Sequence, residues 1–154
     1  MDYEIKTLMN LCYLVNNDQV LLIMKKRGFG QGKWNGPGGK VKKGESPLDS
    51  VIREVKEEIG VEVVNPTELG FIEFIWPYKP ENNNRCYIYL TKEFNGQPTE
   101  SEECRPQWFK IKDIPYNDMW DDDKYWYPDA LAGKVVKKRF FFDKNNKILK
   151  HEDI

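Results

Sequence analysis

Apolar runs and turn residues alternate along this chain in a pattern that predicts an α/β unit. Runs rich in apolar and aromatic residues and bounded by Gly, Pro, Asn or Asp are typical of strands. Such runs lie at residues 11–15, 19–26, 69–76, 86–91, 107–111, 135–143 and 148–150. Asn16-Asn17-Asp18 separates the first two runs and predicts a hairpin, and the turn-rich residues 77–84 join the next two. A helix should start near Pro128 and end at Gly133.

A longer helix is predicted from Pro47 to Ile59. Ser46 suits the N-cap, Pro47 suits the first helical position, and Gly60 suits the helix end. The apolar residues of this segment recur at the spacing of one buried stripe: Leu48, Val51, Ile52, Val55 and Ile59. With the strand pattern, we expect an α/β fold in which a mixed β-sheet is sandwiched between α-helices.

Composition narrows the class of protein. With 154 residues and 40% hydrophobic content, the chain should form a single domain over residues 1–154. The net charge of −1 indicates no general basic surface for binding a nucleic acid polymer. Cys12, Cys86 and Cys104 form no C-x-x-C pair, which argues against disulfides and a cysteine zinc site. No export signal or membrane-length apolar run is present, so we expect a cytoplasmic protein, and a monomer.

Four charged residues of the longer helix, Arg53, Glu54, Glu57 and Glu58, lie off its apolar stripe. Glu54 precedes Glu57 by three residues and Glu58 by four, so the carboxylates are neighbours, and like charges at this spacing repel by roughly 0.2–0.5 kcal/mol per pair. A divalent cation bound between these carboxylates would replace their repulsion with attraction to the metal. Oxygen ligands of this kind suit Mg²⁺ or Mn²⁺. The simpler interpretation is a solvated helix face, which is the commoner fate of an E-x-x-E-E run.

A glycine-rich loop leads into the same helix and favours the metal site over the solvated face. Gly36-Pro37-Gly38-Gly39-Lys40 brings exposed backbone and a lysine to the helix entrance. Taken with Glu45 and Arg53, the segment from Gly39 to Val61 resembles a complete Nudix box. On these residues the chain is identified as a member of the Nudix hydrolases.

Two runs that flank the box carry a more specific resemblance. Residues 24–41 and 105–128 resemble the animal oxidised purine nucleoside triphosphatases, which are MutT homologues. The similarity extends from the first hairpin to Pro128 and weakens in the C-terminal segment. It implies the Nudix fold and Mg²⁺-dependent hydrolysis of a nucleoside triphosphate to the monophosphate and pyrophosphate.

The resemblance also assigns roles on the phosphate side. The implied metal ligands are the carbonyl of Gly38 and the carboxylates of Glu54, Glu57, Glu58 and Glu103. Arg53 matches an arginine that orients a box carboxylate, and it forms the catalytic set with Glu54, Glu57 and Glu58. Glu54, Glu57 and Glu103 all qualify as the general base. Lys25, Gly39 and Lys40 match phosphate contacts, although Lys25 is equally well explained as a surface lysine.

The base side is assigned in the same way. Asn35 matches a purine-contacting asparagine, whose amide can donate and accept at once. Asp122-Asp123 match an acidic pair that reads the other edge of the base, and one of the two should stay protonated because close, buried carboxylates cannot both ionise cheaply. The remaining residues implied to contact the substrate are Asn10, Phe29, Phe74, Trp76 and Trp120. A solvated acidic turn is the alternative for residues 121–123, and the aromatic surroundings favour the base site.

Some positions depart from the resembled pattern: Asn10 replaces a threonine, Trp76 a phenylalanine, Cys104 a methionine and Asp121 a proline. These changes leave the box intact, so they bear on which base is preferred and not on hydrolysis. The first hypothesis is a hydrolase of 8-oxo-dGTP, 2-hydroxy-dATP and related oxidised purine nucleotides. The second is a Nudix hydrolase of ordinary nucleoside triphosphates, dinucleoside polyphosphates or capped RNA ends. The third is a nucleotide sensor without activity, which a complete box argues against.

Overall fold

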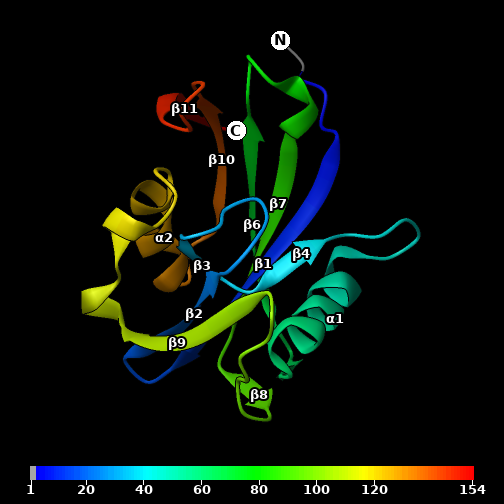
Figure 1. Cartoon of the computed structure of the whole chain (residues 1–154), viewed down its shortest axis with the longest axis vertical. Helices are drawn as coiled ribbons and strands as arrows, with labels where there is room; N and C mark the ends of the chain where they lie inside the picture. Colours follow the sequence, from blue (N-terminus) through cyan, green and yellow to red (C-terminus); the bar gives the residue numbers. More distant parts are fainter. Residues whose placement is uncertain (1–2) are drawn as a thin grey trace.

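Strand β1 (Thr7–Asn16) lies at the centre of the fold and pairs with three other strands. It runs parallel to β7 (Asn84–Thr91) and antiparallel to β4 (Gly38–Lys40) and to the start of β2 (Gln19–Lys25). Within residues 3–154, which the computed structural model describes, these strands belong to a nine-stranded mixed sheet (Figure 1). Its path is β11-β10-β6-β7-β1-β2-β3, with β4 attached to β1 and β9 attached to β2.

The other strands of this sheet are β3 (Trp34–Asn35), β6 (Thr67–Ile75), β9 (Cys104–Lys110), β10 (Val136–Phe142) and β11 (Ile148–Asp153). β10 is parallel to β6, and the remaining pairs are antiparallel. A separate ribbon pairs β5 (Glu62–Val64) with β8 (Glu93–Asn95). Short 3-10 turns lie at Pro80–Asn82, Ile111–Asp113 and Tyr116–Asp118. The predicted strands and the hairpin at Asn17-Asp18 are thus confirmed, while the strand pattern missed β3, β4, β5 and β8.

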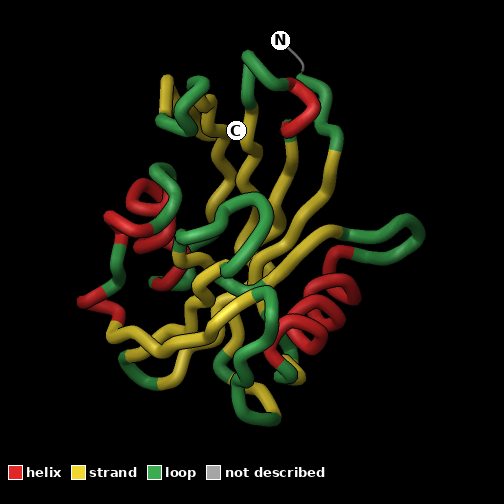
Figure 2. The backbone as a smooth tube through the Cα atoms, in the orientation of Figure 1, coloured by secondary structure: helices red, strands yellow, loops and turns green. Residues whose placement is uncertain are grey.

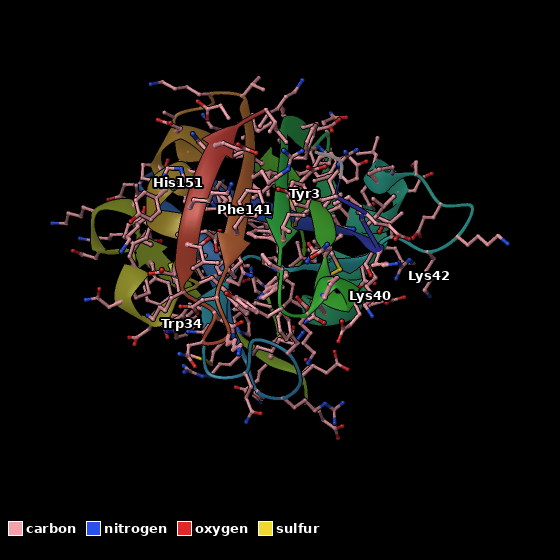
Figure 3. The ribbon with its side chains drawn as sticks, turned by 90° about the horizontal axis from the view of Figure 1, so that it is seen from above. Tyr3, Trp34, Lys40, Lys42, Phe141 and His151 are labelled. Carbon is pink, nitrogen blue, oxygen red and sulfur yellow. The ribbon has the colours of Figure 1, made fainter. Side chains whose placement is uncertain are left out.

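The alternating side chains of β1 separate two hydrophobic cores. Cys12 and Leu14 pack with Val51 and Val55 of helix α1 (Pro47–Ile59) on one side of the strand. Tyr13 packs on the other side, with helix α2 (Asp123–Leu131). Figure 2 shows the two helices on opposite sides of the strands, and seen from above, Lys40 lies on the α1 side and His151 on the α2 side (Figure 3). The predicted sheet between helices is confirmed.

Helix α1 has the predicted bounds and caps. The Ser46 hydroxyl accepts a hydrogen bond from the Asp49 N–H at 3.1 Å, and Gly60 ends the helix in the left-handed conformation with φ of 74°. Leu48 was wrongly assigned to the buried stripe, because it is 43% exposed. Ser50 is buried instead, since its hydroxyl bonds to a side chain of β1.

Helix α2 corrects the second helix prediction. It begins at Asp123 and contains Pro128, whereas the sequence placed Pro128 at its start and Gly133 at its end. A proline is favoured in the first turn of a helix and disfavoured inside. Here the burial of Trp126 and Tyr127 stabilises a turn ahead of the proline, so packing outweighs local preference. No helix among residues 3–154 is long and apolar enough to cross a membrane.

Candidate active site

The glycine loop approaches β1 and α1 so closely that side chains are excluded. A Cβ atom on Gly38 would lie 2.1 Å from the backbone oxygen of Asn10, and a Cβ on Gly39 would lie 2.4 Å from the carboxyl carbon of Glu54. Only glycine fits at either position without a shift of backbone or carboxylate. The consequence is that the Glu54 carboxylate lies directly against the main chain of the loop.

Asn10 supports this loop from the α1 side of β1. Its Nδ2 donates to the Ser50 hydroxyl at 2.6 Å, and its Oδ1 accepts from the Gly39 N–H at 3.2 Å. The side chain is fully buried, and it lies on the side of β1 opposite to Tyr13 and α2. The structure therefore places Asn10 beneath the glycine loop and away from Asp122 and Asp123, which corrects its predicted place in the base site.

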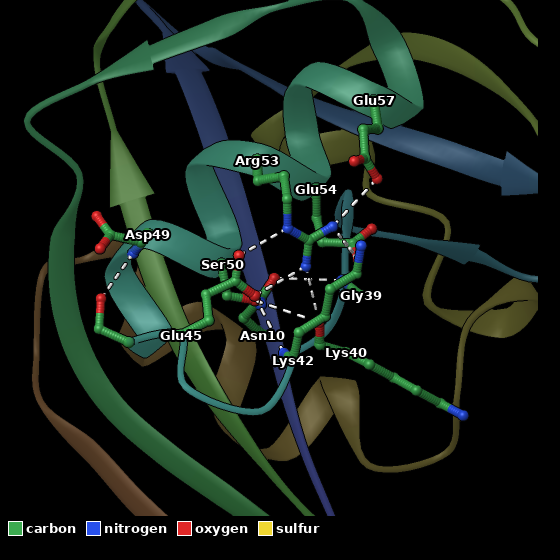
Figure 4. A network of polar contacts seen from close by, with 11 residues as sticks. Asn10, Gly39, Lys40, Lys42, Glu45, Asp49, Ser50, Arg53, Glu54 and Glu57 are labelled. Atoms are coloured by element: carbon green, nitrogen blue, oxygen red, sulfur yellow. Dashed lines mark hydrogen bonds and ion pairs between the residues drawn. The ribbon is translucent and has the colours of Figure 1, made fainter.

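Arg53 organises the acidic residues of α1 (Figure 4). Its Nε and Nη2 donate to the two carboxylate oxygens of Glu45 at 2.7 and 2.9 Å, which is a bidentate ion pair. Its Nη1 donates to Glu54 at 2.9 Å and to Glu57 at 3.1 Å. The hydrogen bonds from Arg53 lower the pKa of Glu45 to about 2, so this carboxylate stays ionised. One guanidinium thus fixes the orientation of both Glu54 and Glu57.

Glu58 is half-buried beside the loop, and its pKa depends on the other charges of the site. Its Oε1 accepts from the Gly38 N–H at 3.3 Å. Burial raises the pKa of Glu58 to about 7; the Gly38 hydrogen bond and the charge of Lys25 oppose this rise, while the charges of Glu54 and Glu103 add to it. The charges that act on Glu58 thus come from β2, from α1 itself and from Glu103, the residue before β9.

We name Arg53, Glu54, Glu57, Glu58 and Glu103 the carboxylate cluster. Glu57 and Glu103 are open to solvent, with 57% and 61% of their side-chain surfaces exposed, whereas Glu54 is 19% exposed. Within residues 3–154, no three Asp, Glu, His or Cys side chains are already gathered around one point as metal ligands. The donors nevertheless fit a hard divalent cation, because the desolvated Glu58 lies among further carboxylates whose repulsion a cation would relieve.

Asp122 and Asp123 form a buried pair and not the solvated turn that the sequence left open. They are 1% and 3% exposed. Asp122 Oδ2 accepts from the Trp126 indole N–H at 2.7 Å, while Asp122 Oδ1 and Asp123 Oδ2 are buried without a partner among the described residues. Burial raises the pKa of both carboxyls, and the charge of Asp122 raises that of Asp123 further. A pair of this kind holds a proton near neutral pH and can both donate and accept.

The predicted aromatic residues come together in one group that includes Trp120, two residues before this pair. Phe29 lies with its ring centroid 5.0 Å from that of Trp120 and 6.1 Å from that of Trp76, and Phe74 lies 6.3 Å from Trp76. Phe142 stacks on Trp76 at 5.0 Å and was missed, because nothing distinguishes it from a core residue of a C-terminal strand. The Trp76 indole N–H donates to Asn146 Oδ1 at 3.1 Å.

Asn35, at the end of β3, completes the arrangement. Its Oδ1 accepts from the Gly36 N–H at 2.8 Å and from the Tyr13 hydroxyl at 3.4 Å. Trp126 links the acidic pair to this contact, because it donates to Asp122 and its ring centroid lies 6.2 Å from that of Tyr13. The charges of Asp122 and Asp123 also raise the pKa of Tyr13. Sequence reasoning missed Tyr13 and Trp126. The i, i+4 spacing of Asp122 and Trp126 would have revealed the latter had α2 been started at Asp123.

We name the second group the aromatic-acid cluster; its members are Phe29, Asn35, Phe74, Trp76, Trp120, Asp122, Asp123 and Phe142. Two open hollows on the surface lie elsewhere, one against β10 and one beside β8, and contain no residue of either cluster. The aromatic-acid cluster and the carboxylate cluster are connected through the chain, since Asn35 is followed by Gly36 and then by the glycines of β4.

Comparisons with known proteins agree with this geometry. The NUDIX domain family model matches residues 9–130. The oxidized purine nucleoside triphosphate hydrolase of Mus musculus is 43% identical over 144 residues, which cover 94% of this chain and 92% of that protein. Its counterpart in Danio rerio is 41% identical over 145 residues, with 94% and 92% covered. The solved MutT protein from Bacillus halodurans superposes with a TM-score of 0.85 at 27% identity and covers 95% of this chain and 96% of that one.

These matches span the glycine loop, helix α1 and most of the aromatic-acid cluster. The Nudix box that the sequence resembles is therefore present in its structural setting, with the loop, helix and arginine in the expected places. The chain belongs to the NUDIX domain family.

Proposed function

We propose that this protein hydrolyses oxidised purine nucleoside triphosphates, such as 8-oxo-dGTP and 2-hydroxy-dATP, to the monophosphate and pyrophosphate. By removing these nucleotides, it would keep them out of DNA. The two animal relatives named above carry this substrate class in their names and align over 94% of the chain. Nudix enzymes typically depend on a divalent metal, and we propose Mg²⁺, with Mn²⁺ as a substitute.

The buried pair Asp122 and Asp123 is the observation that carries the proposal. Three features support its contact with a base. Two of its buried oxygens have no partner among the described residues, and Asn35 is linked to the pair through Tyr13 and Trp126. The third is the aromatic wall, which consists of Phe29, Phe74, Trp76, Trp120 and Phe142. A shared proton lets the pair present either a donor or an acceptor, so purines with different edge patterns can be accommodated. An aromatic wall offers stacking, which is favourable for every base.

The carboxylate cluster supplies the chemistry in this proposal. Bound divalent ions would neutralise phosphate charge and lower the pKa of an attacking water. Glu54, Glu57 and Glu58 would hold the metal with the Gly38 carbonyl and Glu103, and Arg53 keeps Glu54 and Glu57 in position. A carboxylate that is not occupied by metal would accept the proton of the water.

Two lysines are proposed to bind the phosphates. The charge of Lys25 lowers the pKa of Glu58, which supports a phosphate contact over an ordinary surface lysine. Lys40 is exposed at the end of β4, beside Gly39, where the loop backbone is also accessible to a phosphate.

The test is Mg²⁺-dependent release of pyrophosphate from 8-oxo-dGTP, 2-hydroxy-dATP, dGTP and dATP, with the nucleotide product identified by chromatography. We expect the oxidised purines to be preferred and the monophosphate to be the product. Equal turnover of all four would retain Nudix chemistry and reject the specificity. Binding without turnover of any nucleotide would identify a sensor instead.

A further inference from the structure

Tyr13 is a fully buried tyrosine that lies beneath Asn35. Its ring supports the chain next to Asn35 so closely that a Cβ on Gly36 would lie 2.7 Å from the Tyr13 Cε1 atom. Its other side packs on Tyr127, with ring centroids 4.3 Å apart. The hydroxyl reaches the Asn35 amide oxygen at 3.4 Å. Burial and the charge of Asp123 raise the pKa of Tyr13, so the hydroxyl keeps its proton.

The hydrogen bonds of Asn35 give its amide a defined polarity. An amide oxygen has two lone pairs, and here they accept from the Gly36 N–H at 2.8 Å and from Tyr13. The Asn35 Nδ2 donates to no other residue between 3 and 154. In a flipped amide the NH₂ group would face the Gly36 N–H, which leaves two donors opposed. The free end of Asn35 is therefore a donor.

We propose that Tyr13 is a positioning residue for base recognition, which holds Asn35 so that its NH₂ group donates to the base. The base edge that meets Asn35 must then carry an acceptor, either a carbonyl oxygen or an unprotonated ring nitrogen. Asn35 can thus pair only with an acceptor on the base, whereas the pair Asp122 and Asp123 can meet either a donor or an acceptor. This inference rests on the proposed function, and it replaces the expectation that the Asn35 amide donates and accepts at once.

The test is a double-mutant cycle with Tyr13→Phe and Asn35→Ala. Tyr13→Phe keeps the ring under Gly36 and removes only the hydroxyl. We expect KM for 8-oxo-dGTP to rise about 3- to 10-fold, the equivalent of one neutral hydrogen bond, with kcat within about 2-fold. In the Asn35→Ala background, the same change should have no effect on KM, because the residue that Tyr13 positions is gone. Metal-free binding of 8-oxo-dGMP should weaken in parallel with KM.

Tyr89→Phe is the matched control, because Tyr89 is also buried but lies in the core on the α1 side. It should leave KM unchanged, and thermal unfolding should show that both phenylalanine variants fold. An unchanged KM in Tyr13→Phe, while the wild type still prefers 8-oxo-dGTP to dGTP, would overturn the inference and leave the proposed function intact. An equal rise of KM in both backgrounds would also overturn it. A wild type without that preference would reject the proposed function, and this inference with it.

Discussion

The carboxylate cluster and the aromatic-acid cluster differ in how they are built. The first is drawn largely from α1 and is partly open to solvent, and Arg53 pairs with its Glu54 and Glu57, while Glu58 is its one desolvated carboxyl. The second is assembled from β3, β6, α2, β10 and the connecting loops, and its acid pair is buried with two orphaned oxygens. Paired and solvated charges cost little to maintain, whereas buried, unpartnered acids are expensive unless a ligand uses them. The difference is consistent with our proposal that hydrolysis takes place at the first site and that the base is selected at the second.

The largest expected effect separates chemistry from binding. Glu57→Gln removes one carboxylate charge from the α1 surface while keeping the shape of the side chain. We expect Mg²⁺-dependent turnover of 8-oxo-dGTP to fall about 10²- to 10⁴-fold, with binding of 8-oxo-dGMP retained. Glu62→Gln, at an exposed position just beyond the helix, is the control. Activity near the wild-type level would remove the helix carboxylates from the active site.

A pH series tests the electrostatics of the carboxylate cluster without substrate. The folded pKa of Glu58 is about 7 against an ordinary value of 4.5, so the folded state holds the proton more tightly. The resulting stabilisation is present below pH 4.5 and is lost as pH rises through 7, by up to about 3 kcal/mol in the free energy of unfolding.

Thermal unfolding in a chelator from pH 5 to 8 measures this loss, and Mg²⁺ should restore stability at pH 8. Glu58→Gln should reduce the pH dependence to the part that the buried Asp122 and Asp123 contribute, and it should reduce the response to Mg²⁺. Glu62→Gln should change neither. A Glu58→Gln protein with the wild-type pH dependence would show that another group titrates in this window.

Asp122→Asn should reduce the preference for the oxidised base and leave the hydrolytic step itself unaffected. The substitution keeps the shape but prevents the pair from sharing a proton, so kcat/KM for 8-oxo-dGTP should fall about 10- to 100-fold more than that for dGTP. The control is Asp118→Asn, at an exposed position in the preceding turn. An equal loss on both nucleotides would place Asp122 outside base recognition.

The smallest expected effect concerns the hydrogen bond from the Trp76 indole to Asn146. Asn146→Gly removes the acceptor of the Trp76 indole N–H but suits the backbone, because Asn146 has a positive φ of 59°. We expect a loss of about 1 kcal/mol in the free energy of unfolding. Asn145→Gly, one residue earlier in the same turn, controls for the flexibility of glycine. Equal losses in the two variants would argue that the hydrogen bond contributes nothing.

The two clusters also differ in how far the sequence predicts them. Capping residues, glycines and carboxylates within one helix obey local rules, so the amino-acid pattern alone is enough to place α1 and its acids correctly. The partners of Asp122 depend on where α2 starts, and Pro128 is a misleading local signal that tertiary packing overrides. The role of Tyr13 was not predicted, because strand alternation shows which side of the sheet a residue faces but not which hydrogen-bond partner its side chain has. Asn10 was misplaced for the same reason, since a one-residue step along β1 changes the side that it faces.

The parallel pairing of β10 with β6 affects the order in which parts of the protein fold. Strands that pair in parallel across a long stretch of chain must close a large loop, and such contacts form late. Every polar contact of Arg53 lies between residues 40 and 57, whereas the aromatic wall needs Phe142 and Asn146. We therefore expect the contacts of Arg53 to form before the aromatic packing that needs β10. A folding intermediate without β10 would already hold the carboxylates that contact Arg53, but it would lack the packing of Phe142 on Trp76.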